Sequence, residues 1–164
     1  MEATINKAIK LRKNGQYQGS REVLQPLLDN EEYQTKVHLH MAWSYDNEGK
    51  EEEAIKYYHA ALAGLDPESG LETERFETLF GLGCTYRSLG QYDEALIYFE
   101  LTLAEYPDAM AVKPFYAMCL YNLDRAKEAT ALLLEVLVST TDSDDIKAYE
   151  KAILNYSKDL DRTG

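Results

Sequence analysis

Apolar side chains recur every three or four residues along most of the chain, which is the spacing of an amphipathic α-helix. This pattern is interrupted at four anchor positions, Gly15, Gly49, Gly90 and Asp124, and a helical pattern lies on both sides of each. Glycine and aspartate tolerate the left-handed backbone angles of a tight turn. The pattern therefore predicts four pairs of helices, each pair joined at one anchor.

The residues around the anchors repeat in register. The spacing is 34 residues from Gly15 to Gly49 and from Gly90 to Asp124, but 41 residues from Gly49 to Gly90. The positions seven before and five after each anchor are always small: Ala8, Ser20, Ala42, Ala54, Gly83, Ala95, Ala117 and Ala129. The positions four before and nine after are always large and apolar or aromatic: Leu11, Leu24, Tyr45, Tyr58, Tyr86, Phe99, Leu120 and Leu133. Small side chains let helices cross closely and large ones fill the gaps beside the crossing, so we expect stacked antiparallel helix pairs.

The third unit carries the fullest set of residues of a known repeat. This set is Leu82, Gly83, Tyr86, Gly90, Tyr92, Ala95, Phe99 and Pro107. On these residues the chain resembles the tetratricopeptide repeat (TPR) family, in particular small stand-alone TPR domains of bacterial type. The resemblance implies an all-α fold: one domain over residues 1–164, a right-handed α-solenoid of about four helix pairs. The repeats would cover about 1–34, 35–68, 76–109 and 110–141, followed by a capping helix over about 143–161.

Three features depart from a regular repeat. Pro26 lies inside the expected second helix of the first unit, where a proline costs about 3 kcal/mol, so that helix should kink or end early. In the fourth unit Asp124 replaces the anchor glycine, and Pro114 lies near the start of a helix. The additional residues between the second and third units, within 64–73, predict a longer turn or an extended helix start, and the simpler interpretation is a tolerated loop insertion.

A ninth helix is expected after the fourth unit. Capping groups at 142–144 precede Ile146, Tyr149, Ile153, Tyr156 and Leu160, which share one helical face. Repeat arrays end in an element with a polar outer face, and Lys147, Lys151 and Lys158 supply it here. This helix is expected to seal the last pair.

The first helix of every pair lines a concave surface in the TPR family. The resemblance therefore implies that positions ten and six before each anchor point into a groove: Ile5, Ile9, Leu39, Trp43, Phe80, Cys84, Pro114 and Met118. Polar groups follow three and two positions before each anchor: Arg12, Lys13, Asp46, Asn47, Arg87, Ser88, Tyr121 and Asn122. An exposed apolar strip of this kind is uncommon on a soluble monomer without a use. We expect a bound peptide segment whose apolar side chains enter near Trp43 and Phe80 and whose acidic groups reach Arg12, Lys13 or Arg87.

Two other interpretations of the strip stay open. Its residues could simply pack on neighbouring helices, or the strip or the imperfect first unit could be buried in a homodimer. Some family members grip a chain-terminal carboxylate with a Lys, Asn, Asn, Lys and Arg set, and the matching positions here are Ile5, Ile9, His40, Glu77 and Gly81. None of the five is retained, so the resemblance favours an internal or apolar partner segment.

Composition narrows the function further. Lysine and arginine number 17 against 29 acidic residues, a formal net charge of −12, which disfavours nucleic acid as a partner. A secretion signal and a membrane-spanning run are both lacking in the pattern, so no membrane partner is expected. Two cysteines inside apolar helical runs, Cys84 and Cys119, favour a reducing compartment, the cytoplasm.

The sequence does not carry the residue patterns of common enzyme classes. His38 and His40 are two residues apart, which places them on different sides of a helix, and His59 is isolated. The chain has no phosphate loop, dinucleotide-binding glycine pattern or His-Glu-x-x-His motif, and no histidine adjoins Cys84 by phase. We therefore expect no metal, no cofactor and no catalysis, and a scaffold or adaptor that binds another protein.

Overall fold

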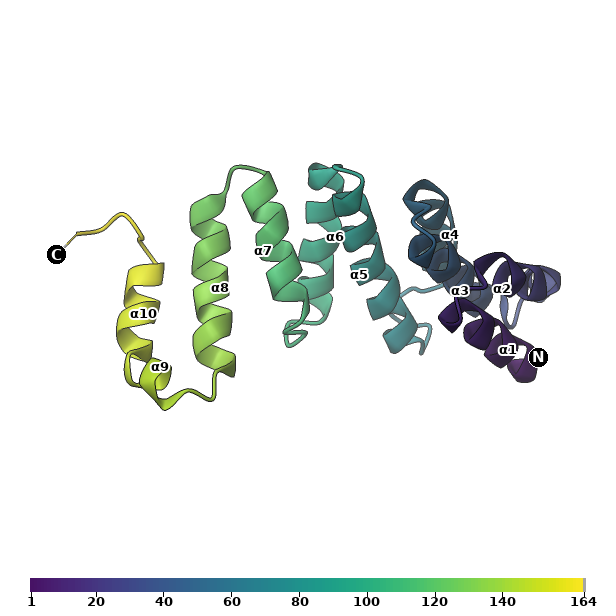
Figure 1. Cartoon of the computed structure of the whole chain (residues 1–164), viewed down its shortest axis with the longest axis horizontal. Helices are drawn as coiled ribbons and strands as arrows, with labels where there is room; N and C mark the ends of the chain where they lie inside the picture. The colour runs from purple at the N-terminus through teal and green to yellow at the C-terminus, as the bar shows by residue number, and fades with distance from the viewer. Residues whose placement is uncertain (164) are drawn as a thin grey trace. The chain divides into compact units, whose positions relative to one another are not determined.

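The computed structural model describes residues 1–163, which form α-helices and one 3₁₀-helix without a strand (Figure 1). The helices are α1 (Glu2–Lys13), α2 (Tyr17–Leu24), η1 (Gln25–Asp29), α3 (Gln34–Asn47), α4 (Glu51–Ala63), α5 (Glu72–Ser88), α6 (Tyr92–Glu105), α7 (Val112–Asn122), α8 (Ala126–Thr140), α9 (Asp144–Ala148) and α10 (Glu150–Ser157). They divide into two compact units, Met1–Gln91 and the part from Tyr92 onward. The predicted all-α fold is confirmed.

The first unit is organised around α3, which contacts α1, α2, α4 and α5. Its core is a cluster of buried apolar residues from α1, α2, η1 and α3: Ile5, Ala8, Leu24, Leu27, Val37 and Met41. Partly buried side chains, including Ile9 and Tyr57, pack against this cluster. The helices therefore share one apolar core, which a single amphipathic pair could not form.

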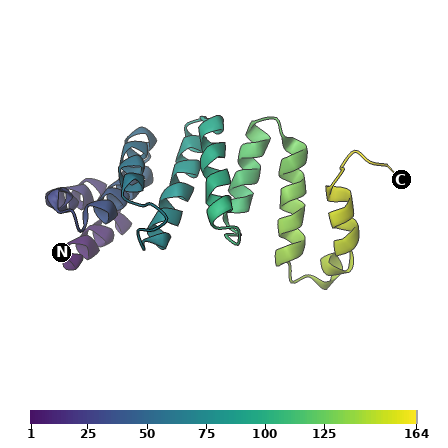
Figure 2. The same cartoon turned by 180° about the vertical axis from the view of Figure 1, so that it is seen from behind.

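The second unit contains α6 packed on α7, α7 on α8, and α10 on α8. Figures 1 and 2 show α7 and α8 as an antiparallel pair joined by a tight turn, with α10 beside α8. Ala117, Leu120 and Ala129 form a buried cluster between α7 and α8. Ala117 and Ala129 are two of the small positions predicted from the repeat.

Burial follows the predicted repeat at the small positions and is less uniform at the large ones, where Leu11, Tyr45 and Tyr86 are half-buried. All eight small positions are buried. The large positions nine after the first three anchors, Leu24, Tyr58 and Phe99, are at most 1% exposed, but Leu133 in the fourth unit is 44% exposed. Leu137, one turn further along α8, is 41% exposed. The last helix pair is therefore only partly covered.

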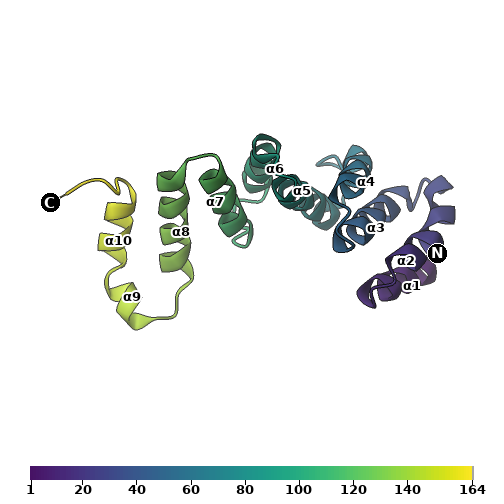
Figure 3. The same ribbon diagram turned by 45° about the horizontal axis from the view of Figure 1, so that its top comes forward.

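The expected capping helix is divided in two. Ser143 caps α9 by accepting a hydrogen bond from the Ile146 N–H, but α9 ends after five residues and α10 begins at Glu150. Figure 3 shows α9 and α10 as two separate helices. The break at Tyr149 changes the phase of the helix, so the apolar face predicted for one continuous helix is not buried as a unit. Tyr149 and Tyr156 are 68% and 49% exposed. This short element leaves the α8 leucines partly uncovered.

The turn and proline predictions are confirmed. All four anchors have a positive φ: 77° at Gly15, 81° at Gly49, 75° at Gly90 and 60° at Asp124. The second helix ends at Leu24, and Pro26 lies in the first turn of the 3₁₀-helix that follows. A proline is tolerated there because the first N–H groups of a helix have no partner within it.

Asp124 holds a left-handed backbone that glycine adopts at lower cost. We expect Asp124→Gly to raise the free energy of unfolding by about 0.5–1 kcal/mol, measured by urea denaturation. Gly49→Asp is the matched control: it places aspartate in the equivalent turn, where a Cβ meets no atom within 4 Å, and should cost a similar amount. Loss of stability in Asp124→Gly would mean that the aspartate side chain stabilises its turn.

The insertion between the second and third units is a fixed turn followed by a longer helix. Leu65 is fully buried, and the Arg75 guanidinium donates a hydrogen bond to the Leu65 carbonyl. Side-chain oxygens of Asp66 and Ser69 accept hydrogen bonds from backbone N–H groups two residues ahead. The following helix, α5, has 17 residues and begins at Glu72. The extended helix start considered from the sequence is thus present.

Candidate functional site

A pocket of about 240 Å³ lies within the first unit, between the first helices of the repeats. Each helix contributes side chains spaced by one helical turn, which places them on one face. The lining residues are Glu2, Ile5, Asn6 and Ile9 of α1, Lys36, Leu39, His40 and Trp43 of α3, and Thr73, Glu74 and Glu77 of α5. The structure thus brings together four candidates of the sequence analysis, Ile5, Ile9, Leu39 and Trp43.

These four apolar residues are not equally accessible. Ile5 and Leu39 are 4% and 2% exposed, so most of each side chain belongs to the core. Ile9 and Trp43 are half-buried. The apolar surface that a ligand could cover therefore comes mainly from Ile9 and Trp43.

Trp43 is held between a cation and an imidazole. The Arg12 guanidinium lies 5.3 Å from the indole centroid and donates a hydrogen bond of 3.0 Å to Asn47 Oδ1. Burial lowers the pKa of Arg12. The His40 ring meets the indole edge-to-face with 5.1 Å between centroids. These contacts restrict the indole, which favours it as a rigid anchor for a ligand.

His40 is uncharged at neutral pH. Burial, followed by the nearby charges of Arg12 and Lys36, lowers its pKa to about 4. Its Nδ1 atom is buried and has no hydrogen-bond partner among residues 1–163. Because the imidazole carries no charge, it adds polarity to the pocket without repelling a cation.

The other sequence candidates lie outside this pocket. Phe80, Cys84 and Arg87 are half-buried further along α5, and Phe80 lies 5.8 Å from Phe76 between ring centroids. Phe80 is not among the residues that line the pocket beside Trp43. Burial raises the pKa of Cys84 to about 12, which keeps its thiol protonated and poorly nucleophilic.

Four remaining candidates are on the surface or near it. Lys13 at the end of α1 is exposed. On α7, in the second unit, Met118 and Tyr121 are 42% and 67% exposed, and Asn122 is half-buried.

Most charged side chains that line the pocket were not among the predicted binding residues, and Glu77 was named only as a position that grips a carboxylate in some family members. Glu2, Lys36 and Glu77 each lie thirteen residues before their anchor, one turn before the first position that was assigned to the groove. Extending the helical periodicity by that turn would have found them. Glu74 and Thr73 lie earlier still, in the first turn of the lengthened α5, where no repeat position corresponds to them.

Asp46, named with the groove residues from its phase, instead belongs to a buried polar cluster. The Tyr58 hydroxyl donates a 2.8 Å hydrogen bond to Asp46 Oδ2, and Thr85 Oγ1 lies 3.4 Å from the same oxygen. Burial raises the pKa of Asp46, whereas the hydrogen bonds from Tyr58 and Thr85 lower it. The cluster connects α3, α4 and α5 and supports the helices that carry the pocket.

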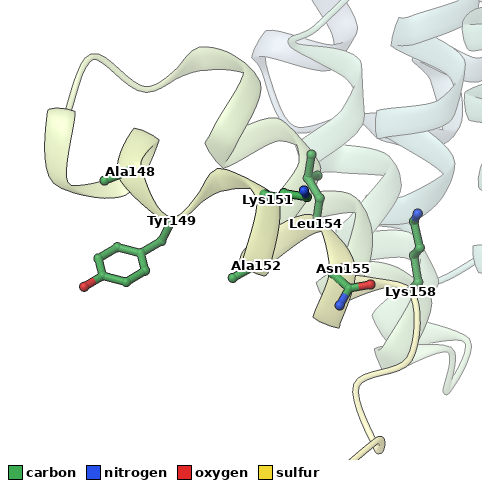
Figure 4. Close-up of a pocket in the computed structure, with 7 residues that line it drawn as sticks. All are labelled: Ala148, Tyr149, Lys151, Ala152, Leu154, Asn155 and Lys158. Carbon is green, nitrogen blue, oxygen red and sulfur yellow. The ribbon is translucent and has the colours of Figure 1, made fainter.

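A larger hollow of about 750 Å³ lies at α9 and α10 (Figure 4). All seven of its lining residues come from the short stretch between Ala148 and Lys158, and Tyr149 points away from the ribbon. A stretch of this length cannot surround a ligand, whereas the smaller pocket is walled by three helices. We therefore assign the candidate site to the smaller pocket.

Among residues 1–163, no cluster of three or more histidine, cysteine or acidic side chains has the arrangement of a metal site. Within the same residues, no helix combines the length and the apolar character needed to cross a bilayer.

The stacked helix pairs place the chain among the helical repeat proteins. Its sequence matches the family model described as tetratrico peptide repeat over residues 1–65 and 35–160. The chain therefore belongs to the tetratricopeptide repeat family, whose domains generally mediate protein interactions and are typically non-enzymatic. No curated protein matches it.

Solved structures share the fold. The chain is similar to the nearly identical TPR-like repeats of a proposed kinesin light chain from Podosopora anserina, with a TM-score of 0.70 and 19% sequence identity. The match covers 95% of this chain and 84% of the other. A single-substitution variant of the same protein matches with the same values. At this identity the likeness concerns the fold alone.

Proposed function

We propose that the chain is a non-enzymatic scaffold or adaptor that binds a peptide segment of another protein in the pocket of α1, α3 and α5. The observation that carries the proposal is the half-buried indole of Trp43, which lies over an apolar floor with Arg12 and His40 on its sides. Tryptophan is enriched among the residues that dominate binding energy at protein interfaces.

The dimensions of the pocket favour a side chain of a peptide over a separate small molecule. Its volume of about 240 Å³ is below the roughly 300–1,000 Å³ of pockets that enclose drug-sized ligands. One apolar side chain over Ile9 and Trp43 would fill it. Further contacts are proposed along α5 at Phe80, Cys84 and Arg87, and on α7 at Met118, Tyr121 and Asn122.

The proposed setting is the cytoplasm. Within residues 1–163 neither Cys84 nor Cys119 takes part in a disulfide, and Cys119 is buried with its Sγ 3.3 Å from the Tyr92 carbonyl oxygen. A chain that keeps its thiols reduced suits a reducing compartment. Binding of an internal segment of a partner requires no cofactor or metal.

Trp43 is the only tryptophan, so its emission reports directly on the pocket. A library of random 12-residue peptides displayed on phage is selected on the whole chain, and synthetic copies of enriched peptides are titrated while the emission is followed. Binding peptides should shift the emission. In anisotropy titrations with fluorescein-labelled copies, Trp43→Asp should weaken binding by about tenfold or more, because it removes an anchoring indole.

Ile97→Asp is the matched control: Ile97 is 56% exposed on α6 and is not among the residues that line the pocket, and the substitution introduces the same charge. It should bind as the wild type does. Circular dichroism checks the fold, and Ile9→Asn replaces Trp43→Asp if the latter unfolds. Failure to enrich any peptide, or binding that Trp43→Asp and Ile9→Asn leave intact, would overturn the proposal.

A second candidate function is self-association. It is favoured by Leu133, Leu137, Tyr149 and Tyr156, four apolar or aromatic side chains of α8 to α10 that are 41–68% exposed. Sedimentation velocity of the same samples at micromolar concentration would show a dimer in that case. A monomer that still binds peptides would rule out self-association and support the adaptor function.

A further inference from the structure

The charged side chains around the pocket are mainly acidic. Glu2, Glu74 and Glu77 line it together with a single cation, Lys36. None of these four side chains forms an ion pair within residues 1–163. Unpaired carboxylates beside an apolar floor are available to a ligand.

The nearby arginine does not offset these carboxylates at the pocket. The Arg12 guanidinium is partly buried against the Trp43 ring and donates to Asn47 Oδ1. His40 is neutral because its pKa is lowered to about 4. Three carboxylates against one ammonium therefore remain at the pocket, an excess of negative charge.

Two of the carboxylates lie on α5: Glu77 at a position shared with the other repeats, and Glu74 in the lengthened start of the helix. Glu74 and Glu77 lie one helical turn apart on α5, so their carboxylates are on the same face as the pocket-lining Thr73. Both are half-buried. A partly buried carboxylate is screened less by water and salt than a fully exposed one. Glu74 and Glu77 should therefore influence a ligand more than the exposed Glu2.

We propose that the pocket selects a protein segment in which an apolar side chain stands within two residues of a lysine or arginine. This inference rests on the proposed peptide-binding function. The apolar side chain covers Ile9 and Trp43, and the cation makes charge-assisted hydrogen bonds with Glu74 and Glu77. An acidic segment would meet three unpaired carboxylates, and like charges at an interface oppose binding.

The inference is tested on the peptides enriched from the 12-residue library. They should carry lysine or arginine beside an apolar residue more often than the unselected library does. Glu77→Lys should weaken their binding by about tenfold, because it replaces an attraction by a repulsion, and Glu77→Gln by a smaller factor. Raising the salt from 50 to 500 mM should weaken binding to the wild type more than to Glu77→Lys.

Glu135→Lys is the matched control, because Glu135 is exposed on α8 and the substitution changes the net charge equally. It should leave the affinity within about twofold, because Glu135 does not line the pocket and all of the lining side chains are kept. Thermal unfolding checks both variants, and Glu74→Lys provides a second charge reversal if Glu77→Lys is unstable.

The outcomes separate the two proposals. The charge preference would be overturned if peptides that depend on Trp43 carried neutral or acidic residues beside the apolar one. It would also be overturned if these peptides bound Glu77→Lys and Glu74→Lys as tightly as the wild type. The peptide-binding function would stand in both cases. Absence of any Trp43-dependent peptide would overturn both. Basic peptides that lose affinity in Glu77→Lys and keep it in Glu135→Lys would support both.

Discussion

Replacing Tyr58 by alanine is expected to lower the free energy of unfolding by about 3–5 kcal/mol, the range for removal of a large buried aromatic side chain. Tyr58 is 1% exposed on α4, and its hydroxyl donates to Asp46 of α3. The substitution leaves a cavity and also a buried carboxylate with one donor fewer. Urea denaturation at pH 7 measures the loss.

Tyr57→Ala is the control on the same helix. Tyr57 is half-buried and stacks on Tyr45 with 5.3 Å between ring centroids, so its removal should cost clearly less. Equal decreases in the free energy of unfolding of the two variants would show that Tyr58 contributes no more to stability than the half-buried Tyr57.

Tyr58→Phe separates the hydroxyl from the ring. Because burial already raises the pKa of Asp46 above its ordinary 3.8 and the Tyr58 hydrogen bond lowers it, loss of the hydroxyl should raise that pKa further. A carboxyl whose pKa is higher in the folded than in the unfolded state stabilises the fold at low pH. This contribution to the free energy of unfolding is lost as pH rises from about 3.8 through the folded pKa. Tyr58→Phe should therefore lower the free energy of unfolding more at pH 7 than at pH 3.

Gly81→Ala should destabilise the chain by about 1–3 kcal/mol, although alanine is the better helix former. A Cβ on Gly81 would lie 2.7 Å and 2.8 Å from two ring carbons of Tyr58. The ring cannot move aside freely, because it is buried and its hydroxyl is bonded to Asp46. The free energy of unfolding in urea again provides the measurement.

Gly19→Ala is a matched substitution without the clash. Gly19 is also inside a helix, α2, but a Cβ there meets its nearest atom only at 3.9 Å. This variant should gain up to about 1 kcal/mol from helix propensity. A stabilised Gly81→Ala would show that α4 and α5 adjust more easily than their packing suggests.

The repeat could be predicted from the sequence because each of its positions must meet a single structural requirement. The small positions must allow close helix crossings, and the structure buries all eight. The anchors must adopt a positive φ, and all four do. Pro26 forbids a continued α-helix, and α2 ends two residues before it. Such demands are local and can be identified in a single sequence.

The pocket could be predicted only in part. Phase placed Ile5, Ile9, Leu39 and Trp43 on facing surfaces of α1 and α3, and they line the pocket together. Phase alone could not reveal that Ile5 and Leu39 are nearly covered, since burial depends on how closely neighbouring helices approach. Helical phase also could not show that Phe80 does not line this pocket, because that depends on how far along the axis of α5 the residue lies.

The termination of the array was the least predictable part. Five apolar residues fitted one helical face over 143–161, yet the helix breaks at Tyr149, where the backbone has φ −105° and ψ 9°. No glycine or proline marks this position. A periodic apolar pattern therefore does not predict a helix boundary when tertiary packing determines where the helix ends.

The longer spacing between the second and third anchors has a consequence for how such chains diversify. The residues added there lengthen α5 by about a turn at its start, and that turn carries Thr73 and Glu74. A comparison of repeats position by position would discard these residues as a gap. Two arrays with identical repeat positions could thus differ in the charge of the pocket lining through an insertion alone, so a change in length can alter a pocket where point substitutions have not.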